Sequence, residues 1–117
     1  PDLWLGTARQ ARDASLMEKI GITAMVNVAG HEEPMKDHPC GAACMEISAE
    51  DHREYPLIAE HFESVREFLQ RCRHSKWTTL IYSVNGLNRS AALAVGWLMV
   101  SEGWTLPKAV HHMHCMR

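Results

Sequence analysis

The stretch WTTLIYSVNGLNRSAALA, residues 77–94, changes its structural character in the middle. Residues 77–82 are rich in β-branched and aromatic side chains, which favour a strand. From Ser90 onward the chain is apolar at nearly every position, which predicts a buried helix lying centrally in the fold. The residues between these two elements therefore connect the end of a strand directly to the N-terminus of a helix.

This connection has the features of an anion-binding loop. At the N-terminus of a helix, backbone N–H groups and the positive end of the helix dipole point to one place. Gly86 allows the loop to curl, and Arg89 offers a planar guanidinium that can bind two phosphate oxygens at once. The spacing alone leaves two interpretations open, a phosphate cradle and an ordinary turn with a surface arginine. The cradle would consist of Ser83, Val84, Asn85, Gly86, Leu87, Asn88 and Arg89.

Strands and helices alternate along the rest of the chain. We expect strands at residues 3–5, 22–28 and 44–47, and a helix over 14–20 between an N-cap at Asp13 and a stop at Gly21. Apolar residues at three- and four-residue steps predict a long helix after Pro56. Gly103 should end the helix that begins at Ser90. A last helix should begin at Thr105 and turn three side chains inward, those of Ala109, Val110 and Met113.

This alternation predicts the α/β class. We expect a single compact domain over residues 1–117, with a mostly parallel mixed sheet flanked by helices and the phosphate-binding loop between a central strand and a buried helix. The chain begins at Pro1 without a methionine and stops at Arg117 within a helical pattern. We therefore expect it to be a piece of a longer protein.

Composition narrows the classes of function. With 117 residues, 46% of them hydrophobic, the chain suits one small globular domain. A net charge of -2 with interleaved signs gives no basic field for nucleic acid or for an anionic membrane surface. The sequence has neither a membrane-spanning apolar run nor a signal-peptide pattern at its start. We expect an intracellular protein of the cytoplasm, the nucleus or both.

The cysteines and histidines raise the question of a metal site. Cys40 and Cys44 stand near His31 and His38, but no second cysteine pair has matching spacing, and Cys72 lies on an apolar helix face where a thiol packs as a small hydrophobe. The remaining candidates are three histidines near the end of the chain, His111, His112 and His114. A solvated helix surface explains them, so they do not require a metal. We expect no metal, no cofactor and no structural disulfide.

The loop after Tyr82 resembles a known signature. Residues 82–90 are similar to His-Cys-x-x-Gly-x-x-Arg-Ser/Thr, the phosphate-binding loop of the cysteine-dependent protein tyrosine phosphatases, and three positions match: Gly86, Arg89 and Ser90. The rest of the chain resembles the dual-specificity branch of these enzymes, in its opening residues 5–8, its strand before Val28, the helix after Pro56 and the closing helix. The resemblance thus extends over the whole length of the chain.

The resemblance implies roles for individual residues. The nucleophile would stand at position 83, and Asp51, about thirty residues earlier, would be the general acid that protonates the leaving group. Arg89 would clamp the phosphoryl oxygens, Ser90 would hydrogen-bond the leaving thiolate, and Asn27 would brace the loop from the neighbouring strand. The implied partner is a phosphorylated protein carrying phosphotyrosine, phosphoserine or phosphothreonine.

Two positions depart from the signature in a way that matters for chemistry. Ser83 replaces the nucleophilic cysteine, and Tyr82 replaces the histidine before it. In an active member the loop holds the cysteine as a thiolate. The pKa of a serine hydroxyl is several units higher than that of a thiol, so a serine nucleophile needs a neighbouring base to remove its proton. We therefore expect the chain to bind phosphate without hydrolysing its ester.

Two origins of Ser83 remain open. It could be a cysteine-to-serine substitution that traps a ligand in an otherwise active phosphatase, or a natural loss of the nucleophile, as in a pseudophosphatase. Tyr82 and Asn85 favour natural loss, because trapping needs only one change. A third hypothesis is a structural interaction domain with a vestigial pocket.

Overall fold

A computed structural model describes residues 3–28, 43–47, 57–83 and 88–116 of the chain. Its strands are β1 (Leu3–Thr7), β2 (Ala24–Asn27), β3 (Ala43–Glu46) and β4 (Thr79–Ser83). Its helices are α1 (Ala8–Ala11), α2 (Ala14–Ile20), α3 (Leu57–His74), α4 (Asn88–Glu102) and α5 (Leu106–Met116). None of the helices in these ranges combines the length and the apolar character needed to cross a membrane.

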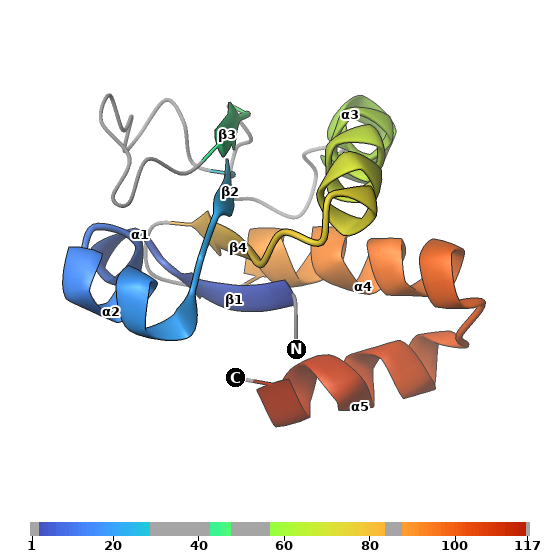
Figure 1. Ribbon diagram of the computed structural model, residues 1–117. Helices are drawn as coiled ribbons and strands as arrows, with labels where there is room; N and C mark the ends of the chain where they lie inside the picture. The colour runs from blue at the N-terminus through green and yellow to red at the C-terminus, as the bar shows by residue number, and fades with distance from the viewer. Residues whose placement is uncertain (1–2, 29–42, 48–56, 84–87, 117) are drawn as a thin grey trace.

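The strands form one sheet in the order β1-β4-β2-β3 (Figure 1), and every described pairing is parallel. β4 lies between β1 and β2, with Thr79 aligned to Leu3 on one side and to Ala24 on the other. A parallel sheet is stable when both of its faces are covered. The parallel pairing and the position of β4 between β1 and β2 confirm the predicted α/β class, with the strand before the signature loop at the centre of the sheet.

Helices cover the two faces of the sheet unequally. Figure 1 shows α1 and α2 together on one side and α3, α4 and α5 on the other. Successive side chains of a strand point to opposite faces, so Leu80 and Tyr82 join the small core under α1 and α2, whereas Ile81 joins the large core under α3, α4 and α5. The large core also buries Cys72, as the apolar stripe of its helix predicts.

Local signals set the ends of α2 as predicted. The backbone N–H of Leu16 donates to a carboxylate oxygen of Asp13 at 3.1 Å, and Gly21 ends the helix in the left-handed conformation with φ 87°. The sequence did not predict α1, which is only four residues long and is fixed by a capping box between Thr7 and Gln10. Four residues are too few to show a helical period.

Of two predictions about the later helices, one is wrong and the other holds in part, since one side of α4 is buried in the large core. Val110 does not point inward but is 50% exposed, while Ala109 and Met113 are buried as predicted. α4 is not surrounded by protein, because Met99 and Val100 are exposed. α4 packs against α3, α5 and β4, so its remaining side faces solvent despite its apolar sequence.

Asp13→Ala should destabilise the domain by about 1 kcal/mol, because it removes the acceptor for an otherwise unpaired N–H in the first turn of α2. Asp13→Asn is the control, since the amide oxygen retains the acceptor. Urea unfolding of the three proteins measures the difference. Equal midpoints for the alanine variant and the parent would show that the cap contributes nothing.

Candidate phosphate-binding site

The carboxyl ends of the strands meet at one edge of the sheet because the strands are parallel. Thr7 and Ser83, the last residues of β1 and β4, are aligned, and Asn27 at the end of β2 is aligned with Tyr82. α4 begins beside this edge, after a connection of four residues. That connection, 84–87, lies outside the described residues, and so does Asp51. The roles predicted for these positions stay predictions.

Ser83 is almost fully buried, with 1% of its surface exposed. It lies two residues after Ile81 on the same strand, so both side chains belong to the face that α3, α4 and α5 cover. Its hydroxyl is therefore on the side of the sheet from which α4 starts. This placement agrees with a loop that runs from Ser83 to the N-terminus of α4.

Arg89 and Ser90 lie in the first turn of α4 and are 6% and 0% exposed. A guanidinium carries a permanent charge, and burying it is costly unless it has partners. Arg89 is not without an interaction partner. Arg89 is therefore not a surface arginine, because the fold holds this cation inside, next to a helix N-terminus. The form of the turn before it lies outside the described residues.

Tyr82 and Asn27 are fully buried neighbours at the same edge. The backbone N–H of Val28 donates to the carbonyl oxygen of Tyr82 at 2.9 Å, which fixes β2 against β4 at this point. The ring of Tyr82 belongs to the small core under α1 and α2, on the opposite face of the sheet from Ser83. Tyr82 is therefore a packing residue and does not stand beside the Ser83 hydroxyl as a base.

The described cysteines do not offer a substitute nucleophile. Burial, with a smaller contribution from the negative charge of Glu46, raises the pKa of Cys44 to about 11, and burial also raises the pKa of Cys72. Both thiols are therefore protonated at neutral pH and are poor nucleophiles. Within the part of the chain that the structure describes, no three His, Cys, Asp or Glu side chains are grouped to hold a metal.

Comparisons with known proteins agree with this architecture. The family described as dual specificity phosphatase, catalytic domain, matches residues 3–117. Human dual specificity phosphatase 28 is 32% identical over 109 residues, which cover 93% of this chain and 60% of that protein. Its crystal structure superposes with a TM-score of 0.86 at 30% identity, covering 100% of this chain and 80% of that one. A mouse chain of the same class, complexed with zinc tungstate, gives 0.83 at 29% identity, covering 100% and 72%.

A parallel α/β sheet with a buried arginine and serines at its carboxyl edge, together with a family match over nearly every residue, defines the class of this domain. The chain belongs to the dual specificity phosphatase catalytic domain family, within the protein tyrosine phosphatase superfamily. Substrates of this family are in general phosphorylated proteins. The chain spans about three fifths of the length of the curated relatives human dual specificity phosphatases 28 and 22.

Proposed function

We propose that this domain binds phosphorylated proteins at the carboxyl edge of its sheet and does not hydrolyse them. The observation that carries the proposal is the pair of buried residues on either side of the loop, Arg89 at 6% exposure and a serine, Ser83, in place of a nucleophilic cysteine. A buried cation at the start of a helix attracts a phosphate dianion. The tungstate complex of the mouse relative supports oxyanion binding by this class of domain.

Each residue of the site has a proposed part in binding. The backbone amides of residues 83–88 surround the phosphate, and Arg89 binds two of its oxygens. Ser90 and Asn27, both fully buried, hold the ends of the loop in place. Asp51 takes the position of the general acid, although without a nucleophile it has no leaving group to protonate.

Hydrolysis fails at its first step. Attack on phosphorus needs an ionised nucleophile or a base that removes its proton. The Ser83 hydroxyl is neutral at physiological pH, and the aromatic residue before it, Tyr82, lies in the core on the other face of the sheet. The domain therefore retains its ligand instead of turning it over, as a pseudophosphatase or a competitor of active phosphatases would.

The alternative is an active dual-specificity phosphatase in which serine replaces cysteine at position 83, and it makes the same binding prediction. The hypothesis of a vestigial pocket differs, because it requires a partner surface elsewhere. Burial of Arg89 favours a retained pocket over a vestigial one, since an unused cation is costly to keep inside a protein.

Calorimetric titration with sodium tungstate is expected to give saturable binding at one site, and a phosphotyrosine peptide should compete for it while the unphosphorylated peptide does not. The same protein should release no p-nitrophenol from p-nitrophenyl phosphate above a heat-denatured control. A protein without tungstate binding would contradict the proposed pocket. Turnover that vanadate inhibits would contradict the proposed inactivity.

A further inference from the structure

A second hollow lies at the other end of the sheet. It has a volume of about 280 Å³, and its lining includes the first residues of β1 and β4, Leu3 and Thr79, which are aligned in the sheet. Ser83 is the last residue of β4, roughly 13 Å along the strand at ~3.3 Å per residue. A ligand in this hollow therefore does not occupy the phosphate site.

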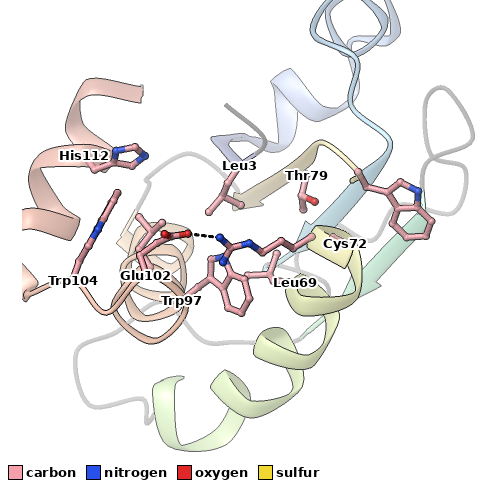
Figure 2. A pocket seen from close by; sticks show the side chains of 11 residues that line it. Leu3, Leu69, Cys72, Thr79, Trp97, Glu102, Trp104 and His112 are labelled. Atoms are coloured by element: carbon pink, nitrogen blue, oxygen red, sulfur yellow. Dashed lines mark hydrogen bonds and ion pairs between the residues drawn. The ribbon is translucent and has the colours of Figure 1, made fainter. Parts of the chain in front are cut away.

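The floor of the hollow is apolar and its walls are aromatic (Figure 2). Leu3, Leu69 and Trp97 are buried residues of the large core. Trp104 and His112 form the wall on the α5 side, with their rings in an edge-to-face contact at 4.9 Å between centroids. His112 is partly buried against Trp104, whereas the sequence predicted a solvated helix surface for it. These surfaces favour a flat apolar ligand.

The charged side chains that line the hollow are Arg73 and Glu102, one of each sign. Arg73 donates to a carboxylate oxygen of Glu102 at 2.7 Å, and their side chains are 50% and 34% exposed, so this ion pair stands where the hollow meets solvent. A guanidinium has five N–H donors, and the bond to Glu102 is the one side-chain hydrogen bond that Arg73 makes among the described residues. The ammonium of Lys108 lies 4.8 Å from the ring centre of Trp104. Lys108 does not line the hollow itself, but its ammonium covers one face of the wall residue Trp104.

We propose that this hollow binds a small aromatic carboxylate, with its ring between the tryptophans and its carboxylate on Arg73. The volume lies just below the ~300–1,000 Å³ of typical ligand pockets, which suits a one- or two-ring molecule and not a length of peptide. An anion is preferred over a cation because the Arg73 guanidinium has more N–H donors than its one bond to Glu102 uses, and because Lys108 already occupies a face of Trp104. This inference is independent of the proposed phosphate binding.

The test uses three probes with the same ring and different charge, 2-naphthoate, 2-naphthamide and 2-naphthylmethylammonium. The protein has four tryptophans, and their indole N–H signals separate in a nitrogen-15 correlation spectrum. Naphthoate should shift the signals of Trp77, Trp97 and Trp104, which line the hollow, and leave that of Trp4, which packs in the small core. Excess inorganic phosphate should not reverse the shifts.

Two variants of the ion pair separate ligand binding from a structural role. Arg73→Gln should weaken naphthoate binding by about three- to tenfold, the modest effect expected of a half-exposed charge. Glu102→Gln should strengthen it, because the probe no longer competes with a carboxylate for Arg73. Arg66→Gln is the matched control, because it breaks the ion pair of Arg66 with Glu63, which is also on α3 but outside the hollow. This variant should bind naphthoate as the parent does.

The proposal predicts opposite effects of the two substitutions on naphthoate affinity. If the ion pair were merely structural, its loss would change the affinity in the same direction in both variants. The proposal is overturned if the amide and ammonium probes bind as well as naphthoate, if Trp4 shifts with the others, or if none of the probes shifts the three tryptophans. Displacement of naphthoate by phosphate would assign the binding to the loop after Ser83 instead.

Discussion

Arg89→Ala is expected to weaken the binding of tungstate or phosphate by roughly tenfold to several thousandfold. Each charge-assisted hydrogen bond contributes on the order of 1.5 to 3 kcal/mol, and the guanidinium can make two of them to one phosphate. The wild-type residue is 94% buried, since 6% of it is exposed, so solvent screens this attraction much less than that of a surface arginine. Calorimetric titration at fixed ionic strength measures the loss.

Two further variants keep this test interpretable. Arg89→Lys retains the charge without the planar fork, so it should recover only part of the affinity. Arg66→Ala removes an arginine from the solvent-facing side of α3 and should leave oxyanion binding unchanged. Circular dichroism of each protein shows whether removing the buried cation has unfolded it. Folded Arg89→Ala and Arg89→Lys proteins that bind tungstate like the parent would show that the anion site lies elsewhere.

Ser83→Cys is expected to produce hydrolysis of p-nitrophenyl phosphate, by roughly a thousandfold or more over the parent, if the rest of the site is sound. Removal of the nucleophile in other covalent enzymes costs even more. The helix dipole and the loop amides lower the pKa of a cysteine at such a position, so the thiolate is present at neutral pH. Steady-state rates with and without vanadate measure the gain.

Ser83→Ala is the matched control for this substitution, because it removes the hydroxyl without adding a thiol, and it should stay inactive. A folded Ser83→Cys protein that binds tungstate and still does not hydrolyse would show that the site has lost more than its nucleophile. The proposed inactivity of the chain with Ser83 and the proposed phosphate binding are thereby tested apart. Turnover by Ser83→Cys is compatible with both origins of Ser83, because each attributes the inactivity to the missing thiol.

Position 82 is harder to restore than position 83. The sequence alone suggests that Tyr82→His would improve the Ser83→Cys protein, because histidine is the usual residue of the signature. The structure adds a cost, since the Tyr82 ring is fully buried among apolar side chains of the small core. A smaller imidazole would leave a void and bury a polar group there.

Sequence reasoning was most successful where neighbouring residues decide the structure. Asp13 and Gly21 set the ends of α2 because a cap and a left-handed residue act within one turn. The strand-to-helix signature before Arg89 likewise lies within a few residues of the chain. The burial of Arg89, in contrast, depends on how α4 packs against the sheet, and its residue type alone suggested a surface position.

The remaining features depend on residues that are distant in the sequence. Val110 was expected to point inward because it is apolar, but which side of α5 is covered depends on how that helix meets α4 and the sheet. The aromatic hollow is assembled from Leu3 on β1, Trp77 between α3 and β4, and Trp104 between α4 and α5, so no single stretch of sequence indicates it. The composition shows that the chain has tryptophans, but it does not show that three of them line one hollow.

The order of the strands has a consequence for how the chain folds. β1 and β2 do not pair with each other, because β4 lies between them. Among the described strands, Leu3 pairs only with Thr79, which is distant in the sequence. A long loop must therefore close before β1 is paired, and the loss of chain entropy comes before the pairing can stabilise the fold. On the ribosome, the first three strands emerge before the strand that joins β1 to β2. Completion of the core is thus delayed until the residues of the proposed phosphate site have themselves been synthesised.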